Sequence, residues 1–230
     1  MNEPPRPARP AAIVFDFDGT AVTLDIGDEI CRRFADPSWI DWDRAWERGE
    51  LPLVEVQRRV WPLVRCGADA LAAWLAETVR FRAGFRELVE EARARAVPVV
   101  IASQGFDLYI RPALATLGPA AAGIRLYANH ADLVDGAVAV DFPHHERFGC
   151  ERCALCKARV VEALRAGGRR VAFFGDGTSD RCVAGRADRL YAVEGEPLAR
   201  LCRERGVPVR PFRTFAEVRD DVLSWMDGAG

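Results

Sequence analysis

The first patterned segment of the chain is an unbroken apolar run. Residues 11–15, AAIVF, carry no polar side chain and lead directly into DFDGT at 16–20. A short apolar run that ends in turn residues is typical of a strand buried on both faces. We therefore predict a central strand over 11–15 and a tight loop directly after it.

The spacing becomes helical between residues 24 and 80. Apolar side chains recur every three or four positions in DIGDEICRRFA, PSWIDWDRAWERG, PLVEVQRRVWPLV and ADALAAWLAETV. This periodicity predicts amphipathic helices. Because no alternating stretch interrupts them, we expect a small helical bundle without strands of its own.

Strands and helices alternate in the rest of the chain. The pattern predicts helices over 84–96, 105–118 and 151–167, strands over 97–103 and 189–193, a strand with its loop over 170–177, and a hairpin turn at Asp135-Gly136. Such alternation indicates an α/β fold, a Rossmann-like core with a mainly parallel sheet. We expect 11–22 and 81–230 to form this core, 23–80 an inserted helical cap, and 1–10 a flexible N-terminal lead-in.

Composition and charge narrow the class of partner. The 230 residues are half hydrophobic and carry a net charge of −2, which indicates a globular protein. This balance predicts no nucleic acid partner, and no apolar run approaches the ~18–20 residues of a membrane span. Since no secretory signal is recognisable, we expect a cytoplasmic protein whose thiols are mostly reduced.

One residue stands out by its rarity. Lys157 is the only lysine among 32 basic residues, and it closes the stretch CERCALCK at 150–157. Arginine and lysine differ where a compact ammonium on a flexible stem is required. Lys157 is therefore a candidate for a site that needs such a charge.

Polar residues follow three of the predicted strands. Asp16 and Asp18 follow the first, Ser103 the second, and Asp176 and Asp180 a later one. The carboxyl ends of parallel strands meet at one edge of a sheet, so these side chains should converge. Clustered carboxylates favour a hard cation such as Mg²⁺, which completes its shell with water and phosphate oxygens. Lys157 would supply a further positive charge there.

The order of these motifs resembles the haloacid dehalogenase-like hydrolases. The resemblance implies that Asp16 is the nucleophile that forms an aspartyl-phosphate, and that Asp18 is the general acid and base. It also implies phosphate binding by Ser103, Gln104, Gly105 and Lys157. The implied Mg²⁺ ligands are Asp16, Asp18 through its carbonyl, Asp176 and Asp180.

Four further stretches resemble one branch of that family. FRAGFRELV, YANH, DFPHH and the cysteines before Lys157 are similar to the phosphatases of bacterial methionine salvage, which act on 2-hydroxy-3-keto-5-methylthiopentenyl-1-phosphate. We thus expect a small phosphorylated metabolite as partner. Alternatives are a phosphoserine or phosphoethanolamine/phosphocholine phosphatase, a phosphomutase, and a non-enzymatic zinc-binding or partner-binding protein. Self-association as a homodimer stays open.

The predicted cap offers three candidate substrate contacts. Asp25 and Asp28 follow the nucleophile loop and could meet an amine or a hydroxyl, although acids also favour the start of a helix. Arg58 is the third candidate.

The cysteines before Lys157 allow a structural zinc site. Cys150, Cys153 and Cys156 have suitable spacing, and His144 or His145 would provide a fourth ligand. A disulfide and simple packing are the alternatives.

Overall fold

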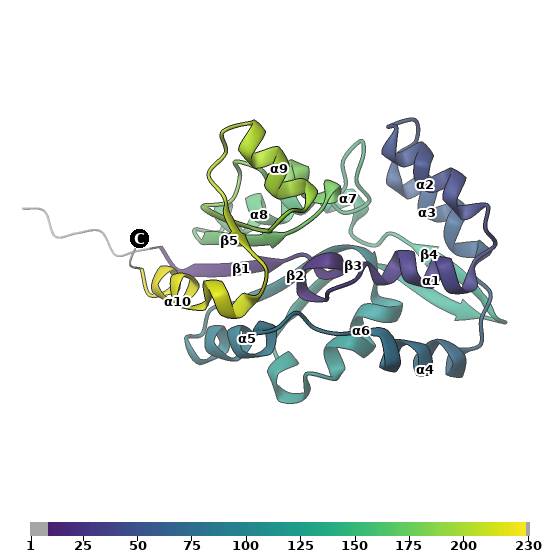
Figure 1. Cartoon of the computed structure of the whole chain (residues 1–230), viewed down its shortest axis with the longest axis horizontal. Helices are drawn as coiled ribbons and strands as arrows, with labels where there is room; N and C mark the ends of the chain where they lie inside the picture. The colour runs from purple at the N-terminus through teal and green to yellow at the C-terminus, as the bar shows by residue number, and fades with distance from the viewer. Residues whose placement is uncertain (1–8, 229–230) are drawn as a thin grey trace, which may run out of the picture.

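The computed structural model describes residues 9–228, which form a seven-stranded sheet covered by helices on both faces (Figure 1). The strand order is β4-β3-β2-β1-β5-β6-β7. Neighbouring strands are parallel except β3 and β4, which form the predicted antiparallel hairpin. The strands are β1 (Ala11–Phe15), β2 (Val99–Phe106), β3 (Arg125–Val134), β4 (Ala137–Asp141), β5 (Arg170–Gly175), β6 (Arg189–Val193) and β7 (Arg210–Phe212). The expected α/β class with a mainly parallel sheet is confirmed.

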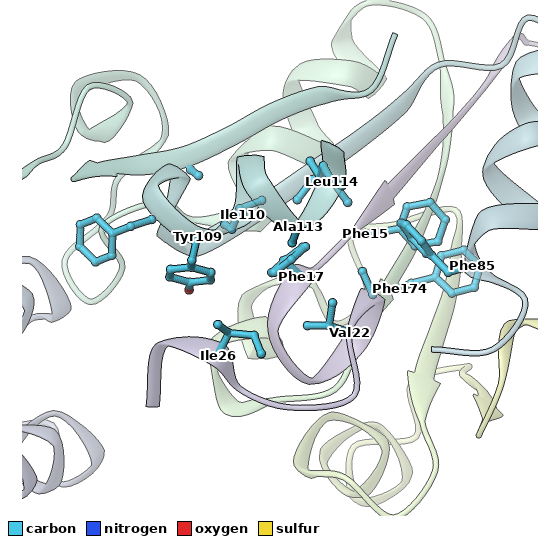
Figure 2. Packing of buried hydrophobic residues seen from close by; sticks show 14 of the residues in the cluster. Phe15, Phe17, Val22, Ile26, Phe85, Tyr109, Ile110, Ala113, Leu114 and Phe174 are labelled. Carbon is cyan, nitrogen blue, oxygen red and sulfur yellow. The ribbon is translucent and has the colours of Figure 1, made fainter. Parts of the chain in front are cut away.

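The central strand β1 is buried on both faces, as its composition predicts. Ile13 and Phe15 belong to one hydrophobic cluster and Val14 to a second one on the opposite face. The first face packs against α5 (Phe85–Ala94), α6 (Asp107–Ala115) and α10 (Phe215–Met226). The second packs against α8 (Lys157–Ala166) and α9 (Pro197–Glu204). Figure 2 shows Phe15 packed with Phe85 and Phe174 in the first cluster. The ring centroids of Phe15 and Phe174 lie 4.8 Å apart.

A helical insertion separates β1 from β2. It contains α1 (Ile26–Phe34), α2 (Trp39–Glu47), α3 (Leu53–Val60), the 3₁₀ helix η2 (Trp61–Leu63) and α4 (Ala68–Thr78), so the predicted helices are present. Its two ends lie side by side, because Val22 pairs with Phe81 in an isolated β-bridge. In Figure 1, α2 and α3 project beside the sheet while α4 lies next to α6.

The insertion also contacts the core at two distant points. Arg65 forms an isolated bridge with Ala137 at the start of β4. The start of α3 contacts the loop before α8, where the Leu53 amide donates to the Arg152 carbonyl at 3.0 Å. The insertion is therefore fixed to the core beyond its two ends.

The helix expected over 151–167 begins later than predicted, at Lys157. Residues before it form a turn instead, closed by the Cys150 amide on the Cys153 carbonyl (3.0 Å) and the Cys156 amide on the Phe148 carbonyl (2.6 Å). The short helices η1 (Phe17–Ala21), η3 (Gly118–Ala121), α7 (His145–Phe148) and η4 (Thr178–Val183) complete the elements.

Two predictions from the sequence concern the N-terminal segment 1–10 and the insertion of the chain into a membrane. Most of the expected lead-in, residues 1–8, lies outside the described residues. Within residues 9–228, no helix combines the length and the apolar character that crossing a bilayer requires.

Candidate active site

The loop after β1 presents Asp16 at the carboxyl edge of the sheet. Asp16 is buried, and its Oδ1 accepts a hydrogen bond from the Phe17 amide at 2.6 Å. Gly19 has a φ of +68°, and a Cβ there would overlap the Asp176 carboxylate. Glycine thus gives the loop both its left-handed turn and its close approach to β5.

Lys157 lies at the centre of the site with a side chain that is 1% exposed. Its Nζ is 2.5 Å from Asp16 Oδ2 and 2.7 Å from Asp180 Oδ1, and it donates to Ser179 Oγ at 2.9 Å. Burial alone would lower the pKa of Lys157, but the two carboxylates raise it above its usual range. The side chain is therefore a permanent cation held between two acids.

Three carboxylates gather around this lysine. Oxygen atoms of Asp16, Asp176 and Asp180 lie within 4.8 Å of one another. Burial and then repulsion by Asp180 raise the pKa of Asp176 to about 7, and the same two causes raise the pKa of Asp16. An all-oxygen set with unrelieved negative charge fits Mg²⁺.

Asp180 is oriented by the backbone of the loop after β5. Its Oδ2 accepts from the amides of Asp176 (3.0 Å) and Gly177 (3.1 Å). Thr20 from the first loop donates to Asp176 Oδ1 at 2.7 Å. Hydrogen bonds thus join the loop after β1 to the loop after β5, as the predicted convergence of the strand ends requires.

Asp18 has different surroundings from Asp16. Its Oδ1 accepts from the Ile26 amide at 3.0 Å and its Oδ2 accepts from the Tyr109 hydroxyl at 2.7 Å. Burial and then the nearby Asp25 charge raise the pKa of Asp18 to about 8, although the bond from Tyr109 acts in the opposite direction. Asp18 therefore retains its proton at neutral pH.

The end of β2 brings Ser103, Gln104 and Gly105 to the same edge. The Gly105 amide donates to Ser103 Oγ at 2.9 Å. The Tyr109 hydroxyl occupies the space where a Cβ on residue 105 would stand. Glycine is required here because the hydroxyl must reach Asp18.

Gln104 is fixed through its backbone while its side chain lacks partners. Its carbonyl accepts from Gln57 Nε2 (2.7 Å) and Asn129 Nδ2 (2.6 Å). Its own amide group is buried without a hydrogen bond, as is Asn129 Oδ1. Buried polar atoms normally have partners, so a ligand atom is the natural complement of this amide.

A cavity of about 250 Å³ lies over these residues. The core contributes all of the strand-end residues except Asp180. The insertion contributes Asp25, Asp28 and Asp43 together with Trp39, Trp46 and Trp61. The side of the cavity that the insertion lines is therefore both acidic and aromatic.

Two expectations for the cap have different outcomes. Asp25 and Asp28 line the cavity, and Asp25 also caps α1 by accepting from the Asp28 amide at 2.9 Å. Arg58 is a correction, since it does not line this cavity. It lies exposed over the Phe142 ring, 5.4 Å from its centroid, because Val56, Gln57 and Val60 form the buried face of α3 that lines the cavity.

The expected histidine ligands for zinc are also a correction. His145 Nδ1 lies 3.0 Å from the Ala154 carbonyl, and the His144 ring packs 5.3 Å from that of Tyr127. Neither histidine joins the cluster, in which Cys182 accompanies Cys150, Cys153 and Cys156 instead.

Several site residues were not anticipated from the sequence. Tyr109 lies on the buried apolar face of α6, and Gln57 and Asn129 lie in segments that are distant from it in sequence. Asp43 belongs to a tryptophan-rich helix with other acids. Only unusual polarity at a buried position could have indicated Gln57 or Asn129.

The chain is similar to one family over most of its length. The sequence profile of the haloacid dehalogenase-like hydrolases matches residues 13–185. The 2-hydroxy-3-keto-5-methylthiopentenyl-1-phosphate phosphatase of Geobacillus kaustophilus (strain HTA426) is 32% identical over 213 residues, covering 89% of this chain and 92% of that protein. A protein of the same name from Exiguobacterium sp. (strain ATCC BAA-1283 / AT1b) is 28% identical over 218 residues, covering 94% and 97%.

Solved structures show the same fold. A phospho-aspartyl intermediate analogue of phosphoserine phosphatase superposes with a TM-score of 0.68 at 20% identity, covering 93% of this chain and 99% of that one. At this identity the likeness concerns the arrangement of elements. It agrees with the parallel sheet and the helical insertion described above.

Proposed function

The chain belongs to the haloacid dehalogenase-like hydrolases and is a phosphatase, and from this premise we propose that it hydrolyses a small phosphorylated metabolite with Mg²⁺ through a phosphorylated Asp16. The observation that carries the proposal is the Lys157 Nζ held between Asp16 and Asp180, with Asp18, whose pKa burial raises to about 8, on the same loop as Asp16. A cation, a carboxylate nucleophile and a proton donor are the groups that this reaction needs.

Asp16, Asp176 and Asp180 would hold the metal, together with the Asp18 carbonyl. Bound Mg²⁺ would neutralise charge on the transferring phosphoryl group. Lys157 provides a second positive charge and keeps Asp16 oriented through its Oδ2. Ser103 and the Gly105 amide, which donates to Ser103 Oγ without substrate, would support the phosphate oxygens from the end of β2.

The reaction proceeds in two displacements. In the first, an Asp16 carboxylate oxygen bonds to phosphorus, the bond from phosphorus to the ester oxygen breaks, and Asp18 gives its proton to that leaving oxygen. In the second, Asp18 takes a proton from water, whose oxygen bonds to phosphorus and releases Asp16. The raised pKa of Asp18 supports the first role, because a proton must be present at neutral pH to be given.

We propose 2-hydroxy-3-keto-5-methylthiopentenyl-1-phosphate as the physiological substrate. The named relatives support this choice, since they match nearly the whole chain, including the insertion that lines the cavity. The unpartnered amide of Gln104 suits a substrate hydroxyl or keto oxygen. The rings of Trp39, Trp46 and Trp61 suit the methylthio end.

One observation favours a second candidate, phosphoethanolamine or phosphocholine. The carboxylates of Asp25, Asp28 and Asp43 line the cavity beside those tryptophans, and burial followed by repulsion from Asp25 raises the pKa of Asp28 to about 7. A substrate ammonium would relieve this repulsion and rest against the aromatic rings. Phosphoserine fits less well, because Lys157 is the only cation among the described lining residues and is already paired.

The mechanism is tested by Asp16→Asn with exposed Asp69→Asn as the matched control. With Mg²⁺ and p-nitrophenyl phosphate, we expect Asp16→Asn to lose at least about a thousandfold in kcat, as nucleophile removal does elsewhere. Asp69→Asn should retain wild-type turnover. Rapid-quench kinetics should show p-nitrophenol formed ahead of inorganic phosphate. Appreciable turnover by Asp16→Asn would refute the mechanism.

The substrate is tested by comparing kcat/KM for the thiopentenyl phosphate, phosphocholine, phosphoethanolamine and phosphoserine. We expect the first to exceed the others by at least about tenfold, which corresponds to ~1.4 kcal/mol of transition-state binding. A preference for the amine-bearing esters would transfer the assignment to the second candidate. Either substrate preference leaves the result of the Asp16→Asn test unaffected.

A further inference from the structure

Four of the seven cysteines meet at one point outside the catalytic site. Cys150, Cys153 and Cys156 come from the turn before α8, whereas Cys182 comes from η4. Their sulfur atoms all lie within 4.8 Å of one another, and all four are free thiols. In a tetrahedral site with Zn–S distances of ~2.3 Å, the sulfur atoms would lie about 3.8 Å from one another. Small side-chain adjustments therefore suffice to form such a shell.

The backbone around the cluster is built to bring these thiols together. The two hydrogen bonds that close the turn, from Cys150 to Cys153 and from Cys156 to Phe148, fold three cysteines toward Cys182. Cys153 and Cys156 are buried, whereas Cys150 and Cys182 are half-buried. The site is thus enclosed but reachable, and its four donors come from two separate segments.

Nearby positive charge suits a site of four thiolates. The hydrogen bond with Cys153, and then the amides of Arg159 and Ala158 at the start of α8, lower the pKa of the Cys156 thiol, although its burial acts in the opposite direction. The guanidinium of Arg186 is close enough to Cys156 and Cys182 to interact with both. Together they offset the charge that remains when one divalent ion is bound by four thiolates.

We propose that Cys150, Cys153, Cys156 and Cys182 bind one structural Zn²⁺ that joins the two segments carrying Lys157 and Asp180. Cys156 directly precedes Lys157, and Cys182 lies two residues after Asp180. The 2.7 Å ion pair between Lys157 and Asp180 spans the same two segments. Thiolate donors select zinc over the hard ion of the carboxylate site, and binding displaces the thiol protons.

The proposal is tested by metal content and by cobalt substitution, neither of which depends on phosphatase activity. Protein purified under reducing conditions should contain about one zinc per chain, the stoichiometry of a four-thiolate site. Co²⁺ added to zinc-stripped protein should give the visible and near-ultraviolet bands of a tetrahedral thiolate complex. Zinc-free protein with reduced thiols and no such bands would overturn the proposal, as would a disulfide within the cluster.

Four variants identify the ligands. Cys182→Ser should weaken zinc binding by more than about 100-fold, beyond the 10–100-fold that loss of a supporting residue costs. Cys66→Ser, at a half-buried cysteine in another part of the fold, should bind normally. Cys182→His keeps a ligand at the position and should retain the metal even if Cys182→Ser folds poorly. His145→Ala should also retain it; loss of zinc there with retention in Cys182→Ser would refute the ligand set.

Discussion

Tyr109 contacts the proton donor of the proposed reaction, and its hydroxyl packs against the Gly105 backbone at the end of β2. Its hydroxyl donates to Asp18 Oδ2 at 2.7 Å and lowers the pKa that burial has raised. We therefore expect Tyr109→Phe to raise the pKa of Asp18 by about one unit, the equivalent of one hydrogen bond to a charged group. The alkaline limb of the pH profile of kcat/KM should move upward accordingly.

Tyr191→Phe is the matched control for this shift. Tyr191 also donates to a carboxylate, Asp221, at 2.5 Å, but from β6, which lies two strands beyond β1 on the side away from β2. Its loss should lower stability without moving the pH profile. An unchanged alkaline limb in Tyr109→Phe would show that Tyr109 has only a packing role.

Gln104 illustrates a conflict between stability and binding. Its buried side-chain amide has no partner, which costs about 1–3 kcal/mol. We expect Gln104→Met to raise the melting temperature of the ligand-free protein and to raise KM about tenfold, the loss of one polar contact of ~1.4 kcal/mol. Calorimetry and steady-state kinetics measure the two effects.

The same substitution at Gln57 should have the opposite effect on stability. Gln57 donates to the Gln104 carbonyl at 2.7 Å, so Gln57→Met removes a satisfied buried bond. Its melting temperature should fall. A fall in both variants would mean that the Gln104 amide is satisfied in the free protein.

The site residues that could be predicted from the sequence belong to short motifs. Asp16, Asp18, Asp176 and Asp180 follow strands and Ser103 lies near the end of β2, and parallel strands necessarily align their ends. Tyr109, Gln104's partners and Cys182 could not be placed in this way, because their roles depend on contacts between segments distant in sequence. Arg58 was misplaced for the same reason, since the direction of a helix face is set by packing.

Gly84 determines how α5 begins beneath the sheet. It is the N-cap residue with a φ of +84°, and a Cβ there would lie 2.5 Å from the Ala216 backbone nitrogen. We expect Gly84→Ala to destabilise the protein by at least about 2 kcal/mol, since the left-handed conformation alone costs 1–2 kcal/mol. Chemical denaturation measures the change.

Gly67→Ala is the control at another helix start. Gly67 precedes α4 with a φ of −82°, and no described atom lies within 4 Å of a Cβ there. The change should stay within about 1 kcal/mol, because a lost cap and a less flexible unfolded chain nearly cancel. Equal destabilisation of both variants would contradict the steric argument.

The start of α8 shows where element prediction failed. The stretch before Lys157 has helical spacing, yet two backbone hydrogen bonds close it into a turn. Those bonds depend on Phe148 and on the cysteine cluster, which no local propensity describes. The strands were predicted more accurately because an apolar run buried on both faces leaves few alternatives.

The whole molecule should respond to Mg²⁺ through its buried carboxylates. Asp16, Asp176 and Asp180 repel one another in the folded state, which a bound cation would reverse. Above the dissociation constant, each tenfold rise in Mg²⁺ adds ~1.4 kcal/mol, or about 3–5 °C in melting temperature for a chain of this size. Thermal unfolding at constant ionic strength measures this.

Asp176→Asn provides the control and fixes the sign of the pH effect. The pKa of Asp176 is raised from 3.8 to about 7, so its stabilising contribution exists below pH 4 and is lost as pH rises to 7. Metal-free wild type should therefore lose stability relative to Asp176→Asn over this range. If Mg²⁺ stabilised the variant as strongly as the wild type, the carboxylates would not be its site.

The contact of Arg152 with the end of α2 and the start of α3 has a consequence for the timing of turnover. It consists of the Leu53 amide on the Arg152 carbonyl at 3.0 Å and the Arg152 guanidinium on the Trp46 carbonyl at 3.4 Å. Two hydrogen bonds can break and re-form in microseconds to milliseconds without unfolding either partner. We expect the departure of the dephosphorylated product past this contact, rather than cleavage of the ester, to limit the rate, so that turnover slows as solvent viscosity increases.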